Sequence, residues 1–253
     1  MKKISMVKKI MLILLALVLV LTGVSVITDT PPFVVIKDKH HFVFSSRLEL
    51  SDSLRSEVYY SNEDVKALEH MRWVKKLEMT VTHITDMSFL NKMKHLKEMY
   101  YVAYTGFWVE DWTPLNNCKK LEFFCGMRLN MSDLSVFKEL TNLKKLYIEH
   151  ERSGAPVVID TKTKINDISD LQYLVNLENF YIQGENITDI SSLAHCKKVK
   201  RLSLNGVTAT DGSVLLELPN LESLEIDKGV LKESEIKALE EKGVSVYEYS
   251  KDE

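Results

Sequence analysis

Apolar residues in this chain recur in a short phrase, L-x-x-L-x-L, with other apolar residues allowed at the fixed positions. The alternation at the end of the phrase is typical of a short β-strand with one buried face. Successive phrases begin 22, 25, 22, 34, 22 and 22 residues apart, which predicts a repeat of 22 residues with two insertions. The seven phrases are VKKLEM (74–79), LKEMYY (96–101), LEFFCG (121–126), LKKLYI (143–148), LENFYI (177–182), VKRLSL (199–204) and LESLEI (221–226).

An aspartate follows each of the first six phrases at a fixed phase, as in ITDM (84–87) and ITDI (187–190). A side-chain oxygen at that place can cap the backbone N–H groups of a helical turn. Leu90 and Met93, three residues apart, predict the inward face of such a turn. One unit cannot bury its apolar residues alone, so neighbouring units must stack. The phased aspartates are Asp86, Asp111, Asp133, Asp167, Asp189 and Asp211.

This pattern resembles the leucine-rich repeat family, in particular its 22-residue, internalin-like bacterial type. The resemblance covers roughly residues 50–250. It implies an α/β fold class, a solenoid with a concave parallel β-sheet and short 3-10 or extended turns on the convex side. The family usually places asparagine three residues after the last leucine of the strand. Thr82, Leu129 and Glu185 occupy that position here, so this chain departs from the family at the corner after the strand.

Both ends of the repeat region predict caps. SNEDVKALEHM (61–71) begins with Ser61 and has acidic residues in its first turn, which indicates a helix start and a degenerate first unit. ESEIKALEEK (233–242) predicts a helix that ends at Gly243, and VSVYEY (244–249) predicts a last edge strand. The predicted parts are a linker with a β cap containing FVF (42–44) and LEL (48–50) at 29–60, repeats at 61–230 and a C-terminal cap at 231–253.

The segment 1–28 has the pattern of a targeting or membrane-spanning helix. Four lysines in the first nine residues precede an apolar run, 10–28, that has no charge before Asp29. As a helix this run would span about 28 Å, close to the hydrocarbon thickness of a bilayer. A cleaved signal peptide and an uncleaved transmembrane anchor both fit, and the length of the run favours the anchor. We therefore expect a single-pass membrane protein with its repeats outside the cytoplasm, or alternatively a secreted protein.

Composition and charge narrow the classes of partner. The chain has 253 residues, of which 45% are hydrophobic and 27% charged, which is typical of a globular protein. Its formal net charge is −3, and without the N-terminal lysines the body is more acidic. Phosphate binding needs clustered lysine and arginine, so nucleic acid is not expected as the main partner. Three cysteines without paired spacing predict neither a disulfide framework nor a zinc site.

Candidate catalytic and metal-binding residues are few. Asp38 with His40 and His41 could contribute to a metal site, but a solvated cap strand is the favoured interpretation. His150 and Glu151 lack the second histidine of the HExxH motif. The spacing of the phased aspartates favours structural caps over acids or calcium ligands. GxSxG, P-loop and Rossmann patterns do not occur, so we expect no enzyme, catalytic residue, metal or cofactor.

The exposed face of the predicted sheet carries aromatic side chains. The residues between the last two apolar positions of the phrases point outward, and they are Glu78, Tyr100, Cys125, Tyr147, Tyr181, Ser203 and Glu225. With Phe123, three of these tyrosines form a stripe across the middle of the sheet. Tyrosine is enriched at binding hot spots, although strands in general also favour aromatic residues. The predicted partner-binding residues are Tyr100, Phe107, Trp108, Phe123, Tyr147, Tyr181, Gln183 and Arg201.

Both insertions follow a strand phrase and so should emerge at the same edge of the sheet. One lies around YTGFW (104–108) and contains Phe107 and Trp108, and the other lies within 149–164. Long insertions on one face of a solenoid often build the rim of a binding site. We therefore expect the longer inserted loop to take part in partner binding.

These features predict an extracytoplasmic leucine-rich-repeat module that binds a protein through its concave face and the inserted loop. A cell-wall glycan-binding or glycan-modifying protein is the alternative, because aromatic stripes also stack on sugars. A glycan-cleaving enzyme needs two carboxylates at a defined distance, whereas Glu78 and Glu225 are expected at opposite ends of the sheet. A structural spacer is a third option. Residues 10–28 are the expected membrane contact.

Overall fold

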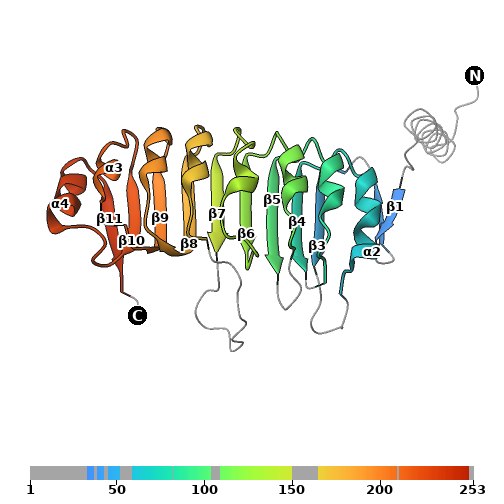
Figure 1. Cartoon of the computed structure of the whole chain (residues 1–253). Helices are drawn as coiled ribbons and strands as arrows, with labels where there is room; N and C mark the ends of the chain where they lie inside the picture. Colours follow the sequence, from blue (N-terminus) through green and yellow to red (C-terminus); the bar gives the residue numbers. More distant parts are fainter. Residues whose placement is uncertain are drawn as a thin grey trace, which may run out of the picture.

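The computed structural model describes residues 33–36, 39–42, 45–51, 59–81, 83–103, 109–149, 165–209 and 211–250. Its main feature is a nine-stranded parallel sheet in which the spatial order of the strands follows the order of the chain (Figure 1). The strands are β3 (Arg47–Ser51), β4 (Lys76–Val81), β5 (Glu98–Ala103), β6 (Phe123–Met127), β7 (Lys145–Glu149), β8 (Asn179–Ile187), β9 (Arg201–Val207), β10 (Ser223–Asp227) and β11 (Ser245–Tyr249).

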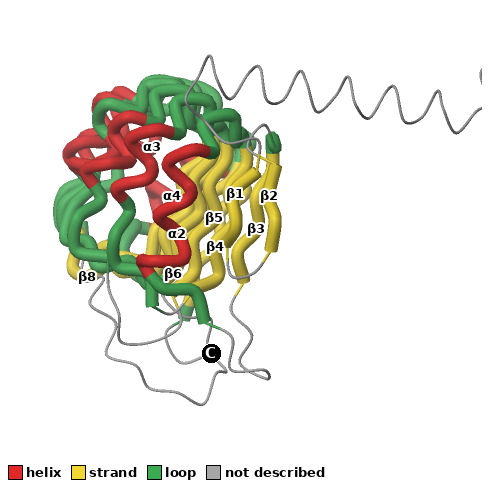
Figure 2. Tube along the Cα trace, turned by 90° about the vertical axis from the view of Figure 1, so that its right-hand side faces the viewer, coloured by secondary structure: helices red, strands yellow, loops and turns green. Residues whose placement is uncertain are grey.

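Each strand from β3 to β9 is followed by a coil that carries a short helical turn. Figure 2 shows these turns on one side of the molecule and the strands on the other, so the solenoid has two layers. A repeat of 22 residues leaves room for little more than one turn between strands, and 3-10 geometry suits such short pieces. The turns are η1 (Lys66–His70), η2 (Ser88–Lys92), η3 (Thr113–Asn117), η4 (Ser135–Phe137), η5 (Ser169–Tyr173), η6 (Ser191–His195) and α3 (Ser213–Leu216). The predicted parallel sheet with short 3-10 turns is therefore confirmed.

The core fills the space between the two layers. Alternate residues of the strands from β3 to β10, such as Leu77 and Met79 in β4, are buried, and they meet the inward residues of the turns. Leu90 and Met93 are also fully buried, as the repeat predicts. The buried residues form one hydrophobic cluster that runs from Val34 to Val244. Stability is therefore shared between neighbouring coils, as expected for a stack of repeats.

The phased aspartates cap the turns, as predicted. In all six coils the aspartate Oδ1 accepts a hydrogen bond from the backbone N–H two residues later, at 2.8 to 2.9 Å. Hydrogen bonds from the side chain and the backbone N–H of the residue two positions later lower the pKa of several of the carboxyls below the ordinary range, because they stabilise the charged form. The groups with a lowered pKa are Asp111, Asp133, Asp189 and Asp211.

The corner after β6 shows how the chain replaces the usual asparagine. Leu129 occupies that position and is fully buried. Gly126, which stands where neighbouring strands have a large apolar residue, makes room for it. A Cβ atom at Gly126 would lie 2.7 Å from Leu129 Cδ1. Leu129 at the corner therefore fills the space that a large side chain at position 126 of the strand would occupy.

A different set of asparagines joins the coils. Asn142, Asn176 and Asn220 each donate a side-chain hydrogen bond of 2.8 Å to a backbone oxygen of the preceding coil. They lie just before β7, β8 and β10, at the edge of the sheet opposite to the usual asparagine position. They satisfy backbone acceptors that would otherwise lack a partner.

The N-terminal side of the repeats begins with two features. A short hairpin of β1 (Phe33–Ile36) and β2 (Lys39–Phe42) is antiparallel, whereas β3, which contains the LEL phrase, pairs with β4 as the first strand of the main sheet. Helix α2 (Asn62–Val65) has the predicted start, in which Ser61 and Asp64 form a reciprocal capping box.

The C-terminal side also has the predicted elements. Helix α4 (Glu233–Glu241) is followed by Gly243, whose positive φ of 86° suits the stop after a helix. Strand β11 then completes the sheet as its last, edge strand.

The segment 1–28, with its predicted anchor or signal, lies outside the residues that the structure describes. Within the described ranges, no helix is long and apolar enough to cross a membrane. In the same ranges, no group of three or more histidine, cysteine, aspartate or glutamate side chains is arranged to hold a metal ion. His40 and His41 lie in strand β2.

Candidate partner-binding face

The predicted outward residues form a continuous row across the sheet. Strand registers place Glu78, Tyr100, Cys125, Tyr147, Tyr181, Ser203 and Glu225 side by side in this order. The structure extends the row at both ends, with Glu49 on β3 and Tyr247 on β11. The turns cover the opposite side of the sheet (Figure 2). We call the group Tyr100, Phe123, Tyr147 and Tyr181 the aromatic stripe.

The rings of the aromatic stripe are in contact over three strands. The ring centroids of Tyr100 and Phe123 are 4.6 Å apart, and those of Phe123 and Tyr147 are 5.5 Å apart at 90°. Phe123 comes from the neighbouring row of the sheet and fills the gap that the small side chain of Cys125 leaves between the tyrosines. Tyr181 pairs with Tyr147 across β7 and β8. Mutual packing reduces the freedom of these side chains, which lowers the entropy cost of binding a partner.

The stripe is bordered on its β4 side by an ion-pair network. Glu78 accepts bonds from Lys76 at 2.9 Å and from Arg47 at 3.1 Å. The hydrogen bond from Lys76 holds the pKa of Glu78 below its ordinary value, while the pKa of Lys76 is raised. Lys76 Nζ also lies 4.8 Å from the centroid of the Tyr100 ring, a cation–π distance. The charges of Arg47, Lys76 and Glu78 therefore partly neutralise one another, and Lys76 contacts Tyr100, the first ring of the stripe.

A shallow hollow of about 420 Å³ adjoins the stripe where β5 to β7 begin. Its floor includes Tyr100 and Phe123. Glu122 on its rim is bonded by Lys144 at 2.8 Å and Lys97 at 2.7 Å, and these bonds lower its pKa to about 2. The hollow thus offers two aromatic surfaces beside a paired carboxylate that is ionised at neutral pH.

The far side of the stripe is polar and largely uncharged. Gln183 is half-buried and Arg201 is exposed. Ser203 is only 6% exposed, and its hydroxyl has no hydrogen-bond partner among the described residues. Next to it, the Tyr249 hydroxyl lies 3.1 Å from Glu225 Oε2. This flank offers amide, guanidinium and hydroxyl groups to a partner.

Sequence reasoning missed the contribution of the last strand to this face. Tyr247 is 63% exposed and Tyr249 is 43% exposed, and both belong to β11. The alternation in VSVYEY could have placed them in the row if the outward positions had been extended beyond the seventh phrase.

The tyrosine hydroxyls and the Cys125 thiol of the face are protonated at neutral pH. Burial raises the pKa of Tyr100, Tyr147 and Tyr181, so their hydroxyls stay protonated and can donate hydrogen bonds at neutral pH. Burial also raises the pKa of Cys125 to about 11. A thiol must ionise to act as a nucleophile, so Cys125 is unsuited to that role.

Two predicted site residues, Phe107 and Trp108, lie outside the described residues, as does the segment 150–164. The strands that precede these segments, β5 and β7, are parallel members of one sheet and therefore end at the same edge. β7 and β8 pair directly, although their phrases start 34 residues apart. The long insertion therefore leaves the sheet itself continuous.

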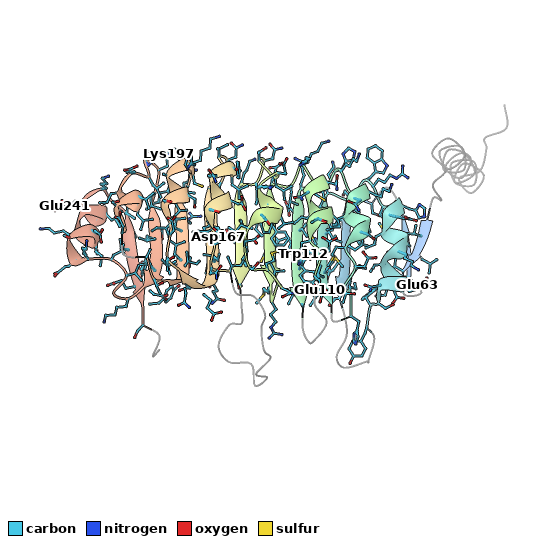
Figure 3. All side chains as sticks on the ribbon, in the orientation of Figure 1. Glu63, Glu110, Trp112, Asp167, Lys197 and Glu241 are labelled. Carbon is cyan, nitrogen blue, oxygen red and sulfur yellow. The ribbon has the colours of Figure 1, made fainter. Side chains whose placement is uncertain are left out.

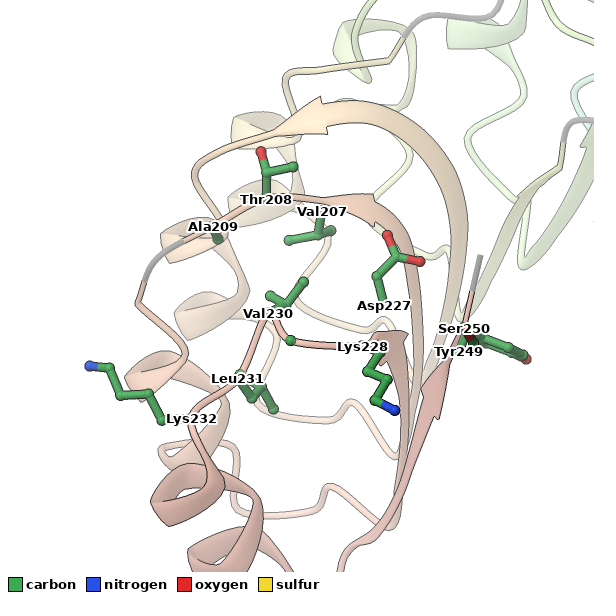
Figure 4. A pocket seen from close by; sticks show the side chains of 11 residues that line it. Val207, Thr208, Ala209, Asp227, Lys228, Val230, Leu231, Lys232, Tyr249 and Ser250 are labelled. Carbon is green, nitrogen blue, oxygen red and sulfur yellow. The ribbon is translucent and has the colours of Figure 1, made fainter. Parts of the chain in front are cut away.

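A separate pocket of about 710 Å³ lies at the C-terminal end, between the loops after β9 and β10 and the end of β11 (Figure 4). Asp227 lines it, but Asp227 Oδ2 already accepts a 2.7 Å hydrogen bond from the Gly206 N–H. The pocket is open and lies away from the aromatic stripe, so its volume alone does not make it the functional site.

The chain resembles leucine-rich-repeat proteins of the internalin type. Internalin C2 of Listeria monocytogenes is 20% identical, with 67% of this chain and 71% of that chain covered and a TM-score of 0.49. The internalin inlF of the same organism is 16% identical, with 85% and 84% covered and a TM-score of 0.36.

A leucine-rich-repeat protein of Leptospira interrogans is 13% identical, with 72% of this chain and 56% of that chain covered and a TM-score of 0.37. No family model and no curated protein matches the sequence. At these identities the similarities carry no ligand or role over to this chain. The assignment of the fold rests on the nine parallel strands and the repeated turns described above.

Proposed function

We propose that this protein is an extracytoplasmic binding module that holds a protein partner on the outer face of its sheet. The observation that supports this function most is the aromatic stripe, because a contiguous run of packed aromatic rings is the composition of a binding hot spot. Its neighbours are internally paired charges on one flank and polar groups with the guanidinium of Arg201 on the other. Such a border excludes water around a central anchor.

The location outside the cytoplasm rests on the apolar run 10–28 and the lysines before it. We propose that this run keeps the protein in the membrane as a single-pass anchor, with cleavage and secretion as the alternative. Cell fractionation distinguishes the two. Full-length protein in the membrane fraction supports the anchor, whereas protein in the medium with a new N-terminus near Val26 supports a signal peptide.

Binding of a cell-wall glycan is the second candidate, and one observation favours it. Amide side chains stand beside the rings, with Asn179 two residues before Tyr181 and Gln183 two residues after it. Rings that stack on sugars are commonly combined with amides that bond sugar hydroxyls. A glycan array probed with the full chain tests this candidate. Specific binding that is lost in Tyr181→Ala would indicate that the partner is a glycan and not a protein.

Site-specific crosslinking tests the protein-binding function. A photoreactive benzoylphenylalanine replaces Tyr147 in the stripe or, as a control, Tyr173, which is 48% exposed and lies in η5 on the other layer. We expect irradiation in cells to link a discrete envelope protein to position 147 and not to position 173. Crosslinks of equal pattern and yield at both positions would contradict a binding role for the stripe.

A further inference from the structure

The two-residue turns that precede the strands share an unusual charge pattern. Each of the eight strands from β4 to β11 is preceded by one such turn, at 72–73, 94–95, 119–120, 141–142, 175–176, 197–198, 219–220 and 242–243. No turn contains an acidic residue, and together they contain seven cations: Arg72, Lys94, Lys119, Lys120, Lys197, Lys198 and Lys242. Because the strands are parallel and adjacent, the turns align along one long edge of the solenoid, where Figure 3 labels Lys197. We call these eight turns the basic edge.

The capping aspartates lie away from the basic edge. The six capping aspartates follow the strands, at the far end of the sheet from the turns of the basic edge. Figure 3 shows Glu110 and Asp167 well below Lys197. The chain is acidic as a whole, with a net charge of −3, whereas the eight turns contain cations and no acidic residue. A molecule polarised in this way is oriented by any extended anionic surface.

Most of the turn cations are not neutralised by a carboxylate, although Lys197, Lys198 and Lys242 donate hydrogen bonds to neutral oxygens of neighbouring coils. Within the described ranges, only Lys119 among the seven has a carboxylate partner, Glu139 at 3.2 Å. The exposed lysines and arginine therefore keep charge that the protein does not itself neutralise.

Large apolar side chains are exposed at the same edge. Trp73 is 47% exposed in the first turn and stacks on His95 of the second at 4.8 Å. Val175 is 50% exposed in the fifth turn, and Tyr173, two residues earlier, is 48% exposed. Tryptophan and tyrosine prefer the interface between lipid and water, where their rings lie at the level of the head groups.

We infer that the basic edge docks on an anionic lipid surface. Neighbouring strands are about 4.8 Å apart, so the turns form a closely spaced row that can meet a bilayer along its whole length. Lysine and arginine are attracted to anionic head groups, and Trp73, Tyr173 and Val175 gain by entering the head-group region. A soluble polyanion would use the cations but would leave these apolar side chains in water. Docked this way, the sheet stands upright on the membrane and the aromatic stripe stays accessible.

Vesicle binding of the full chain tests this inference. Co-sedimentation is measured with vesicles of phosphatidylcholine alone and of phosphatidylcholine mixed with phosphatidylglycerol. The neutral vesicles report any binding that comes from the apolar run 10–28. The turn variant carries Lys94→Gln, Lys120→Gln, Lys197→Gln and Lys198→Gln. The control variant carries Lys145→Gln, Lys228→Gln, Lys232→Gln and Lys237→Gln, which change the net charge equally at other surfaces.

We expect the native chain to bind anionic vesicles more tightly than neutral ones. In the turn variant, the ratio of the two affinities should fall by at least about tenfold, because each cation near such a surface contributes to binding. The control variant should stay within about twofold of the native chain. Melting curves confirm that both variants are folded. Trp73→Phe should abolish the fluorescence quenching that brominated anionic lipid causes in the native chain.

Three results would overturn the inference. The native chain could show no preference for anionic vesicles. The two variants could lose binding equally, which would indicate a dependence on net charge alone. Soluble polyphosphate could bind the native chain in a turn-dependent manner while vesicles do not, which would identify a phosphate polymer rather than a membrane as the partner.

Discussion

A single type of hydrogen bond is repeated at every capping aspartate. The carboxylate accepts the N–H that begins the following turn, and that N–H has no partner within the turn itself. The bond is local in sequence, which is why the residue pattern predicted it. The pattern did not predict the bonds of Asn142, Asn176 and Asn220, because their acceptors lie in another coil, 23 to 35 residues away.

Removal of one capping carboxylate should destabilise the protein without affecting binding. Asp189→Ala leaves the Ser191 N–H, now bonded at 2.8 Å, without its acceptor. We expect a loss of about 1 kcal/mol in the free energy of unfolding, as for other helix caps. Thr188→Ala, an exposed neighbour, is the matched control and should change little. An Asp189→Ala protein of native stability that failed to bind its partner would show that the aspartate row has a direct binding role.

The lowered carboxyl pKa values predict how stability depends on pH. Hydrogen bonds lower the pKa of Asp111, Asp189 and Asp211, and ion pairs lower that of Glu122 to about 2. A group with a lower pKa in the folded state stabilises the protein above its ordinary pKa, and this contribution is lost as the pH falls through the folded value. The melting temperature should therefore fall as the pH drops from about 4.5 to about 2, by protonation of these groups.

Asparagine at the caps provides the control for this pH effect. Its side-chain oxygen still accepts the bond, but the group does not titrate. The test uses a triple variant with Asp111→Asn, Asp189→Asn and Asp211→Asn. Its melting temperature should fall less between those pH values than the melting temperature of the native chain. Identical pH profiles for the two proteins would show that the caps do not contribute to acid unfolding.

At the scale of elements, the period of apolar residues was sufficient to predict the seven strands, the short turns and α4. Two features could not be read from it. Strand β3 joins the main sheet because its backbone pairs with β4, a long-range contact with no signature in LEL alone. The corner after β6 depends on a compensating pair, since Gly126 in the strand makes space for Leu129 outside it. Each of these two residues looks like a departure from the repeat when it is considered alone.

The compensation between Gly126 and Leu129 can be measured with a double-mutant cycle. Gly126→Val should overpack the site and cost about 1–3 kcal/mol. Leu129→Ala should leave a cavity and cost about 2–5 kcal/mol. Each change relieves the defect of the other. Denaturant unfolding should therefore show the double variant to be more stable than the sum of the two single losses predicts. Additive losses would show that the two side chains do not share one space.

The long insertion should be dispensable for folding. β7 and β8 already pair across it, and deletion of residues 152–163 restores the 22-residue spacing between their phrases. We expect the shortened chain to keep the native circular dichroism spectrum and a closely similar melting temperature. If the inserted loop forms part of the binding rim, partner affinity should fall in the same variant. Loss of cooperative unfolding would instead assign the insertion a structural role.

The whole molecule has three surfaces of different character. They are the aromatic stripe on the sheet, the basic edge at the two-residue turns before the strands, and the capping aspartates that follow the strands. The stripe could be predicted from sequence because strand alternation fixes which residues face outward. Its extension to Tyr247 and Tyr249 was not predicted, since it depends on β11 joining the same sheet. The charge separation between the edges depends on alignment of eight coils, which only the stacked structure shows.

Titration of the crosslinked envelope protein against the full chain tests the central claim, that the stripe is the binding face. Tyr147→Ala and Tyr181→Ala should each weaken binding by about 1–3 kcal/mol, the usual size for an aromatic hot spot. Tyr173→Ala, an exposed tyrosine in the other layer, should bind as the native chain does. Unchanged affinity in both stripe variants, with native melting temperatures, would contradict the account and move the binding site away from the sheet.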